Sequence, residues 1–332
     1  MEKLLTISIA AYNVEKYIRN TIESLIIEDM DALEILVQDD GGTDRTAEIV
    51  YEYQGKYPDS IRLVNKENGG YGSTINASIK MASGKYFKQL DGDDWYETEN
   101  LSKLVEVLRK TDVDLIYTPF CDFIEQESKK TIRRVFQTDM TGYHLFSEAI
   151  TECSGRINMY SSCFKTSILK EHKIRLLENC FYTDTEYALY PIAYINDIYI
   201  CDFPIYNYRL GVEGQSVSLE GRRKHYKDHL KVDRRLVSFY SAFPEDKKNV
   251  KNYIADYIKD TCSDGLTEYA MLIEPTQETK REIVGHDLFI KKHAADVYDL
   301  IGKKSKRMWI MRKSNYALYY ILAKIKIREV QR

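Results

Sequence analysis

The stretch KYFKQLDGDDW (Lys85–Trp95) joins an apolar run to a cluster of acidic residues. Its first half is typical of a buried strand, and Asp91, Asp93 and Asp94 follow it. Carboxylates crowded in this way repel one another unless a cation joins them. The stretch therefore predicts a strand whose carboxyl end holds a cation.

The chain before this stretch alternates between strand and helix patterns. The predicted strands are 4–10, 33–38, 61–65 and 85–90. The segments that turn into predicted helices are 14–27, 41–57 and 67–82, with Asn13 and Thr43 or Asp44 as N-caps. This alternation with short connections predicts an α/β fold, a mainly parallel sheet flanked by helices.

Polar segments fall where the predicted strands end. They are Ala10–Asn13, Asp39–Asp44 and Asp91–Asp94, joined by the glycine-rich turn Glu67–Gly72. Ligands of such sheets bind beyond the carboxyl ends of the strands. We therefore expect these segments to converge on one site.

The rest of the chain divides near residue 220. Up to that point we expect helices over 98–110 and from Thr183, strands over 113–125, 131–137 and 198–210, and a strand followed by a helix over 163–174. The two strands 113–125 and 131–137 form a predicted hairpin. From 221 to 332 the pattern is helical, over 222–243, 247–272, 278–298 and a basic tail. The prediction is a domain over 1–220 and a helical region over 221–332.

Composition indicates an ordinary globular protein in a reducing compartment. The formal net charge is −3, and the six cysteines form no C-x-x-C pair. The N-terminus lacks the pattern of a signal peptide, and no apolar run reaches the length of a membrane span. These features predict a cytoplasmic protein with reduced thiols.

Each acidic segment has a structural alternative to a ligand site. A divalent cation such as Mg²⁺ or Mn²⁺ suits Asp91 and Asp93, since both ions prefer oxygen ligands. Asp94 also fits an acidic turn that caps the next helix. Asp39 is placed to accept from the ring N–H of a base, although Asp–Gly sequences are also ordinary turns. The turn at Asn68–Gly70 alone is weak evidence of phosphate binding, because it matches no complete phosphate-loop pattern.

Taken together, these segments resemble family 2 glycosyltransferases, which have the GT-A nucleotide-diphospho-sugar transferase fold. The matching pieces are ISIAAYNVEKYIRNTIESL (7–25), ILVQDDGGTDRTAEIV (35–50), NKENGGYGSTINASIKMASGKYFKQLDGDDW (65–95) and, more loosely, 181–193 and 204–211. They follow the order of the family. The resemblance implies a metal-dependent, inverting transfer of a sugar from a nucleotide-diphosphate donor, a UDP-sugar, with Mn²⁺ or Mg²⁺ as cofactor.

The resemblance also implies roles for particular residues. The residues implied to bind the nucleotide are Ala11, Tyr12, Asn13, Asp39, Asp40, Asn68, Gly69, Gly70 and Asp91. Asp91 and Asp93 match the D-x-D of the family, with Asp93 as the direct metal ligand. Asp184 matches the catalytic base, which would take the proton of the acceptor hydroxyl.

Some positions depart from the family pattern. Thr183 stands where the family usually has an acid before Asp184, and Ile75 where it commonly has an arginine. Helix capping is the structural alternative for Asp184, and Glu186 or Asp202 are alternative bases. The incomplete acidic pair motivates a second function: a non-catalytic nucleotide-sugar-binding subunit that partners an active transferase.

The C-terminal tail has its own charge pattern. Residues 291–332 hold twelve Lys/Arg and three Asp/Glu, mixed with aromatic and aliphatic side chains. A basic amphipathic helix of this kind suits an anionic membrane surface, and packing on the protein is the alternative. Binding at the inner face of the membrane fits a lipid-linked saccharide acceptor in the synthesis of surface polysaccharide or glycoconjugate. Nucleic acid is not expected as a partner, because the rest of the chain is acidic. The segment 212–218 fits either a mobile lid or a plain surface loop.

Overall fold

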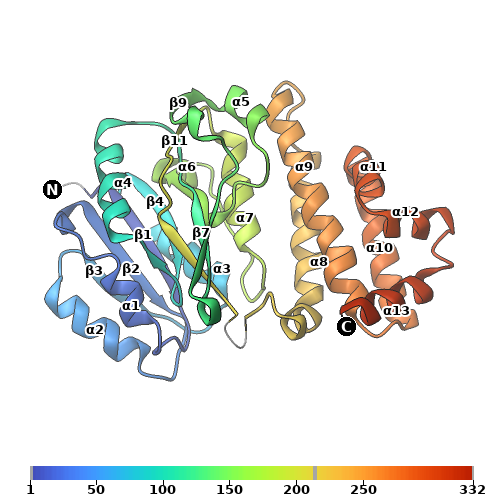
Figure 1. Ribbon diagram of the computed structural model, residues 1–332, viewed down its shortest axis with the longest axis horizontal. Helices are drawn as coiled ribbons and strands as arrows, with labels where there is room; N and C mark the ends of the chain where they lie inside the picture. Colours follow the sequence, from blue (N-terminus) through green and yellow to red (C-terminus); the bar gives the residue numbers. More distant parts are fainter. Residues whose placement is uncertain (1–2, 212–214, 331–332) are drawn as a thin grey trace. The chain divides into compact units, whose positions relative to one another are not determined.

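The computed structural model describes residues 3–211 and 215–330 and divides the chain into two compact units (Figure 1). The first unit is Met1–Val212 and the second is Glu213–Arg332. Part of the segment 212–218, which we considered as a lid, lies outside the described residues. Each unit is described by itself below.

An eight-stranded sheet forms the centre of the first unit. In spatial order its strands are β3 (Ile61–Asn65), β2 (Leu33–Asp39), β1 (Leu5–Ala11), β4 (Tyr86–Asp91), β10 (Ser162–Lys165), β6 (Leu115–Tyr117), β11 (Asp197–Ile200) and β9 (Gly142–Leu145). The strands from β3 to β4 are parallel, and β10 pairs antiparallel with both β4 and β6. The predicted α/β fold, with a mainly parallel first half, is confirmed.

The register of the sheet brings the polar strand ends together. Ala11 of β1 lies opposite Asp39 of β2, and Ala10 lies opposite Asp91 of β4. Most of β1 is buried, as expected for a central parallel strand covered on both faces. Three acidic or polar strand ends therefore share one edge of the sheet.

Helices flank the sheet of the first unit (Figure 1). They are α1 (Ile18–Glu23), α2 (Thr46–Lys56), α3 (Tyr71–Met81), α4 (Thr98–Lys110), α5 (Phe146–Ala149), α6 (Thr166–Glu171) and α7 (Asp184–Leu189). The helix expected over 98–110 is confirmed, and its buried residues follow helical spacing.

The first predicted helix is shorter than its apolar pattern, and its expected cap is wrong. α1 begins at Ile18, and Tyr17 is its N-cap residue. Asn13 has a φ of 52°, which places it in a loop, and its side chain accepts a hydrogen bond from the backbone of Thr43. The expected cap of α2 is also wrong, because its N-cap residue is Arg45 rather than Thr43 or Asp44. Asp44 Oδ1 instead accepts from the backbone N–H of Thr46, the first residue of the helix, at 2.9 Å.

Two long predicted strands are each divided between two sheets. The second sheet has the order β5 (Trp95–Tyr96), β12 (Tyr206–Leu210), β7 (Phe120–Ile124) and β8 (Lys129–Arg133). The strand expected over 113–125 becomes β6 and β7, separated at Pro119, and the strand expected over 198–210 becomes β11 and β12, separated near Pro204. Proline has no N–H to donate to a neighbouring strand, so each of these two segments can leave the first sheet at its proline. The hairpin of β7 and β8 is confirmed.

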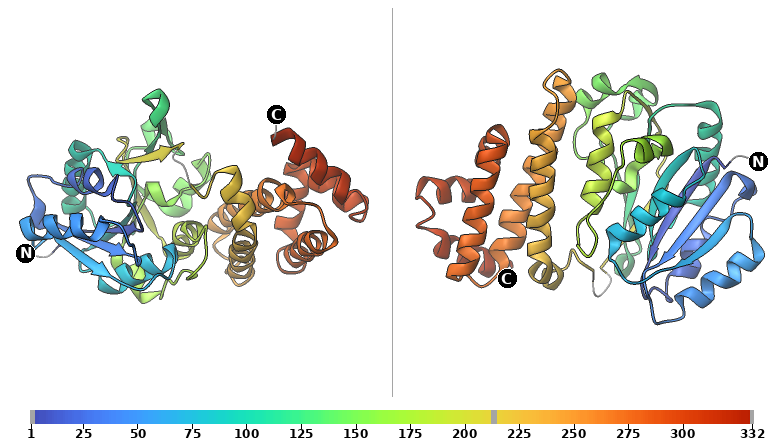
Figure 2. Two further views of the ribbon diagram at one scale, coloured as in Figure 1. Left: turned by 90° about the horizontal axis from the view of Figure 1, so that it is seen from below. Right: turned by 180° about the vertical axis from the view of Figure 1, so that it is seen from behind.

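The second unit is helical, as predicted (Figure 2). Its helices are α8 (Leu219–Ser241), α9 (Lys248–Asp264), α10 (Gln277–His293), α11 (Ala295–Lys304), α12 (Lys306–Lys313) and α13 (Tyr319–Val330). The helix expected over 278–298 is interrupted at Ala294, which has a φ of −151°. A π-helical turn, Gly265–Tyr269, follows α9.

The basic tail forms two helices rather than one. Asn315 and Tyr316 both have positive φ, and this turn separates α12 from α13. Both helices pack against the second unit, with Met308, Met311 and Tyr319 fully buried. Within residues 3–211 and 215–330, no helix combines the length and apolar character needed to cross a membrane.

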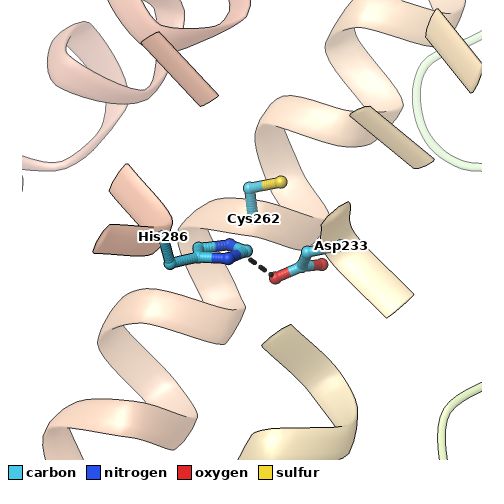
Figure 3. A group of neighbouring side chains, drawn as sticks. All are labelled: Asp233, Cys262 and His286. Carbon is cyan, nitrogen blue, oxygen red and sulfur yellow. Dashed lines mark ion pairs between the residues drawn. The ribbon is translucent and has the colours of Figure 1, made fainter. Parts of the chain in front are cut away.

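A polar cluster is buried between three helices of the second unit. Asp233 of α8, Cys262 of α9 and His286 of α10 point into the same small space (Figure 3). His286 Nε2 lies 3.5 Å from Asp233 Oδ2, and His229 Nδ1 lies 3.2 Å from the same oxygen. Burial raises the pKa of Asp233, but the two histidines outweigh it and bring the pKa below its usual value. The Asp233 carboxylate is therefore an anion that lies between the rings of His229 and His286.

Further contacts surround the ring and the thiol of this cluster. The Arg234 side chain donates to His286 Nδ1 at 3.4 Å, and His286 Nε2 is the nitrogen that faces Asp233. Burial, followed by the nearby Asp233, raises the pKa of the Cys262 thiol well above its ordinary value.

Removal of Asp233 should destabilise the helical unit. We expect Asp233→Ala to lower the free energy of unfolding by roughly 3 kcal/mol at neutral pH, because both rings lose their buried acceptor. The lowered pKa means that this stabilisation is present above pH 3.8 and fades as the pH falls below it, so the deficit should shrink in acid. Urea unfolding followed by circular dichroism measures both effects. The exposed Asp246→Ala variant is the control, and an equal loss in both variants would contradict this role.

Candidate active site

Three carboxylates lie together where β4 ends. Oxygen atoms of Asp91, Asp93 and Asp94 all lie within 4.8 Å of one another. Asp91 closes β4, and Asp94 is almost fully buried before the short strand β5. The cluster is the acidic site that the sequence predicts at this strand end.

Gly92 permits the close approach of this turn to β1. Its backbone N–H donates to the carbonyl of Ala10 at 2.9 Å. A Cβ atom at position 92 would lie 2.9 Å from the same carbonyl oxygen and 3.0 Å from the Val14 side chain. The glycine between the two aspartates thus fixes them against the end of β1.

Burial and mutual repulsion disfavour the charged forms of all three acids. Burial, then Asp93 and Asp184, raise the pKa of Asp91 to about 8. Burial raises the pKa of Asp93, and Arg209 partly opposes this shift. Burial, followed by its two neighbours, raises the pKa of Asp94 well above its usual value. A site that penalises three anions this strongly fits a divalent cation.

Residues far along the chain hold Asp94, which the sequence suggested as a helix cap. α4 begins at Thr98 with Glu97 as its N-cap residue, so Asp94 does not cap it. Instead, Asp94 Oδ2 accepts from the Tyr206 hydroxyl at 2.7 Å, and Oδ1 accepts from the backbone N–H of Arg209 at 2.7 Å. Asp94 therefore attaches the acidic turn to β12.

Two further residues at the site, Tyr71 and Lys66, were missed in the sequence. The Tyr71 hydroxyl donates to Asp91 Oδ1 at 2.7 Å, and Lys66 pairs with Asp40. Both residues lie beside the glycines of NGGYG, and that proximity was the available signal. Arg209, which the sequence offered as a source of positive charge, donates from its side chain to the carbonyl of Asp93 at 3.0 Å.

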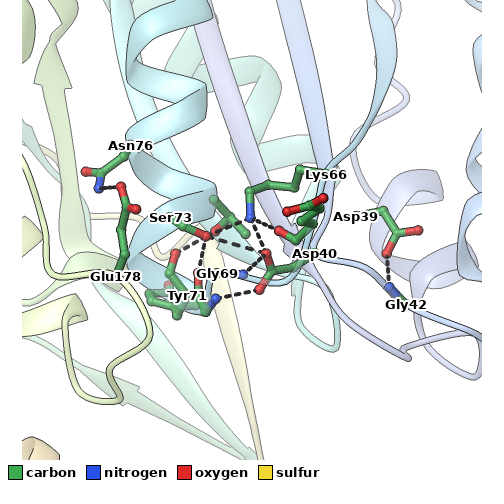
Figure 4. A network of polar contacts seen from close by, with 12 residues as sticks. Asp39, Asp40, Gly42, Lys66, Gly69, Tyr71, Ser73, Asn76 and Glu178 are labelled. Atoms are coloured by element: carbon green, nitrogen blue, oxygen red, sulfur yellow. Dashed lines mark hydrogen bonds and ion pairs between the residues drawn. The ribbon is translucent and has the colours of Figure 1, made fainter.

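Asp40 organises the loop that precedes α3 (Figure 4). Its carboxylate accepts from the backbone N–H groups of Gly69 and Gly70, at 3.0 and 2.8 Å, and from Lys66. The Lys66 ammonium also donates to Ser73 Oγ at 2.8 Å. Gly70 has a φ of 76°, a conformation that glycine adopts readily. Asp40 thus shapes the glycine turn from within.

Asp39 and Asn13 stabilise the neighbouring loop. Asp39 is nearly buried, and its Oδ1 accepts from the backbone N–H of Gly42 at 2.9 Å (Figure 4). Asn13 Oδ1 accepts from the backbone N–H of Thr43 at 2.8 Å. Both residues therefore lie at the ends of β1 and β2, as expected.

A cavity of about 560 Å³ opens above these strand ends. Its lining includes most of the residues that the sequence singled out: Ala11, Tyr12, Asp40, Asn68, Gly70, Asp91 and Asp93. Asn13, Asp39, Gly69 and Asp184 do not line it directly. Phe181 and Tyr71 also line the cavity, and neither was predicted. The structure therefore brings the first three motifs and the acidic cluster around one space.

Asp184 lies in the first turn of α7, near the acidic cluster. Its charge contributes to the raised pKa values of Asp91 and Tyr71. The alternative base Glu186 is fully buried and accepts from the backbone of Leu177 and the Tyr190 hydroxyl, so it has a structural role. Asp202 is exposed in the turn between β11 and β12. Of the three candidates, Asp184 has the charge that acts on Asp91 of the acidic cluster.

Hydrogen bonds link the segment before α7 to α3. Asn76 of α3 exchanges two hydrogen bonds with the backbone of Leu176, at 3.0 and 2.9 Å. The next residue, Leu177, donates its backbone N–H to Glu186 at 2.7 Å. Asp184 therefore lies on a helix that is attached to the helix beginning at the glycine turn.

The departures from the family pattern have structural consequences. Thr183 is buried, and its hydroxyl has no hydrogen-bond partner. Ile75 is buried inside α3, so it leaves no side chain in the cavity. The sequence offers two arginines, Arg209 and Arg19, in place of the arginine that Ile75 replaces. Arg209 adjoins Asp93, whereas Arg19 pairs with Glu52 of α2.

Comparisons with known proteins agree with this geometry. Residues 6–168 match the family described as Glycosyl transferase family 2. The chain is 24% identical over 256 residues to the "Putative glycosyltransferase EpsH" of Bacillus subtilis and 36% identical over 107 residues to a chondroitin synthase of Escherichia coli. A structure of S. aureus TarS 1-349 in complex with UDP-GlcNAc superimposes with a TM-score of 0.74 at 18% identity, over 98% of this chain and 92% of TarS 1-349.

These findings define a glycosyltransferase with the GT-A fold. The match to glycosyltransferase family 2 lies in the first unit, over residues 6–168. The match to EpsH covers 75% of this chain and 71% of EpsH, and the match to the chondroitin synthase covers 32% and 16%. The resemblance inferred from the sequence motifs is confirmed.

The contact between Tyr206 and Asp94 should stabilise the first unit. We expect Tyr206→Phe to lower the free energy of unfolding by about 1–3 kcal/mol, because it leaves a buried carboxyl group short of one donor. Urea unfolding measures the change. Tyr12→Phe is the control, since Tyr12 is 54% exposed. Equal stability of the Tyr206 variant and the wild-type protein would show that the hydroxyl does not hold the turn.

Proposed function

We propose that this protein transfers a sugar from a nucleotide-diphosphate donor, a UDP-sugar, to a hydroxyl group of a saccharide, with inversion at the anomeric carbon. The observation that carries the proposal is the cluster of three carboxylates within 4.8 Å beside a cavity of about 560 Å³. Family membership supports the reaction class, and the bound UDP-GlcNAc of TarS supports the choice of UDP.

The acidic cluster fits a divalent cation, Mn²⁺ or Mg²⁺. Asp93 and Asp91 would hold it, because their carboxylates lie together and their charged forms are disfavoured without a cation. When bound, the cation would neutralise charge that develops on the departing diphosphate. Tyr71 would fix the Asp91 carboxylate through the hydrogen bond to its Oδ1.

The strand ends and the glycine turn would bind the nucleotide. Ala11, Tyr12 and Asn13 follow β1, and Asn68, Gly69 and Gly70 precede α3. Asp39 would accept from the ring N–H of a uracil-type base. Asp40 would hold the turn in shape through its bonds to the glycine N–H groups. The exposed ring of Tyr12 lines the cavity and offers a stacking surface.

Asp184 would act as the general base. Its carboxylate would accept the proton of the acceptor hydroxyl while the oxygen attacks the anomeric carbon opposite the diphosphate. The cavity beside it includes Phe181, whose ring is 44% exposed and offers an apolar surface to an acceptor sugar. One displacement of this kind inverts the anomeric configuration.

Loss of Asp93 should remove metal-dependent donor binding. We expect wild-type protein to bind UDP in the presence of Mn²⁺ and Asp93→Asn to bind it about ten-fold or more weakly, because the amide removes one anionic ligand. Isothermal titration calorimetry with and without Mn²⁺ measures the difference. Asp59→Asn is a matched control, since Asp59 is exposed in the turn before β3, away from the carboxyl ends. Mn²⁺ dependence that is unchanged in Asp93→Asn would refute the metal site.

Loss of Asp184 should affect turnover more than binding. We expect Asp184→Asn to lower kcat by about 10²–10⁴-fold, the usual contribution of a general base, while UDP binding changes little. Transfer from the UDP-sugar that best raises the melting temperature is the assay. Asp202→Asn, which changes an exposed acid outside the cavity, should retain activity.

Two other outcomes would redirect the proposal. Full turnover by Asp184→Asn would show that another group takes the proton. Binding of UDP-sugars by wild-type protein without turnover on any saccharide acceptor would favour the alternative function, a nucleotide-sugar-binding subunit of an active transferase.

We also propose a setting for the reaction. Residues 1–220 would form the catalytic domain, and 221–332 a helical region with a basic tail. The acceptor would be a saccharide or lipid-linked saccharide in the synthesis of a surface polysaccharide or glycoconjugate, as the chondroitin synthase relative suggests. The protein would act in the cytoplasm at the inner face of the membrane, and the six free cysteines agree with a reducing compartment.

A further inference from the structure

The last helix of the chain has two opposite apolar sides. Tyr319, Ala323 and Lys326, at positions i, i+4 and i+7 of α13, are buried against the second unit. Ile321, Ile325 and Arg328 have the same spacing two residues later and are exposed. Packing within the unit therefore uses only one side of the helix.

The exposed side carries large aliphatic groups. Ile321 is 57% exposed, Ile325 44% and Leu318, one turn ahead of Ile321, 39%. Helical geometry places Lys324 and Arg328 beside these three residues. We call Ile321, Lys324, Ile325 and Arg328, together with Leu318 directly before the helix, the outer face of α13. Exposed aliphatic residues gathered in this way mark an interaction surface more often than scattered ones do.

The basic side chains of the tail differ in their partners. Four of them make ion pairs within the second unit: Lys304 with Asp260, Arg312 with Asp287, Lys326 with Glu268 and Arg307 with Glu329. Another four, Lys306, Lys313, Lys324 and Arg328, are exposed. No acidic partner is found for these four among residues 3–211 and 215–330. The fold thus neutralises the paired basic side chains and leaves Lys306, Lys313, Lys324 and Arg328 able to contact an anionic partner.

The neighbouring helix α12 adds to the same chemistry. Lys306, Trp309 and Lys313 lie at i, i+3 and i+7 and are exposed, whereas Met308 and Met311 are buried. Trp309 is 51% exposed. An indole ring between lysines is typical of the interface between water and a lipid bilayer.

We propose that the outer face of α13 binds the surface of an anionic lipid bilayer. Leu318, Ile321 and Ile325 enter the boundary between headgroups and acyl chains, and Lys324 and Arg328 contact anionic headgroups. The proposal concerns peripheral binding by a helix of twelve residues that lies on the surface. In Figure 2, α13 lies at the C-terminal end of the helical unit.

Charge distinguishes this occupant from a second copy of the chain. A two-fold contact through the outer face would place Lys324 and Arg328 near the same residues of the other copy. Glu329, the one acid of α13, already pairs with Arg307. An anionic bilayer offers the opposite charge and an apolar interior at the same time, so it matches both parts of the face.

The inference goes beyond the proposed glycosyl transfer and does not depend on it. If the transfer proposal holds, the outer face of α13 would bring the protein to the membrane that carries the acceptor. Vesicle binding needs neither donor nor acceptor, so its failure would leave UDP binding and turnover unaffected. Equally, failure to bind UDP or to transfer a sugar would not affect the expected binding to vesicles.

Vesicle sedimentation of the full chain tests the proposal. We expect wild-type protein to bind vesicles of phosphatidylcholine mixed with phosphatidylglycerol, and to bind phosphatidylcholine alone weakly. Added salt should weaken the binding, because it screens the charge contribution. A double variant, Ile321→Gln with Ile325→Gln, and a charge variant, Lys324→Glu with Arg328→Glu, should each bind about ten-fold or more weakly.

A matched control lies on α10. Leu288 is 46% exposed and Lys292 is also exposed one turn later, so Leu288→Gln with Lys292→Glu makes one change of each kind on another exposed helix. This variant should bind vesicles as wild type does. Circular dichroism establishes that each variant is folded, and the charge variant alone suffices if the glutamine variant fails to fold. Absence of binding to the anionic vesicles, equal binding by the α13 variants, or a dimer in solution that Ile321→Gln dissociates would each overturn the proposal.

Discussion

Repulsion among Asp91, Asp93 and Asp94 is the constraint on which the first unit depends. The backbone bond from Gly92 to Ala10 brings the acids against β1, and Tyr206 and Arg209 hold Asp94 from β12. These contacts keep the carboxylates close despite an electrostatic penalty that is visible in the raised pKa of Asp91. A fold that maintains such a penalty has the usual character of a functional site.

The surrounding structure places these acids beside other polar groups that a ligand could contact. Parallel pairing of β2, β1 and β4 places three strand ends at one edge, and Asp40 shapes the glycine turn beside them. One fold can occur in very different sequences and carry different sites, because its loops can vary while the ends of its strands stay in register. The low identity to TarS at a TM-score of 0.74 illustrates this freedom.

The sequence predicts local features of this protein better than distant contacts. The strands of the first half, the helix over 98–110 and the acidic strand end follow from periodicity and turn chemistry within short windows. Helix capping stayed open as an alternative for Asp94 because its actual partners lie more than a hundred residues away, in β12. The breaks at Pro119 and Pro204 were likewise missed, since apolar residues continue on both sides of each proline. The roles of individual site residues rest on family resemblance rather than on periodicity.

The bonds that join Asn76 to Leu176, and Leu177 to Glu186, tie the glycine turn before α3 to the helix that bears Asp184. In the reaction proposed above, the distance between the departing diphosphate and the base would then be set when the protein folds, and both substrates would have to fit it. A glycosyltransferase that instead brought its base into place by loop closure would need a flexible hinge at the position of these hydrogen bonds.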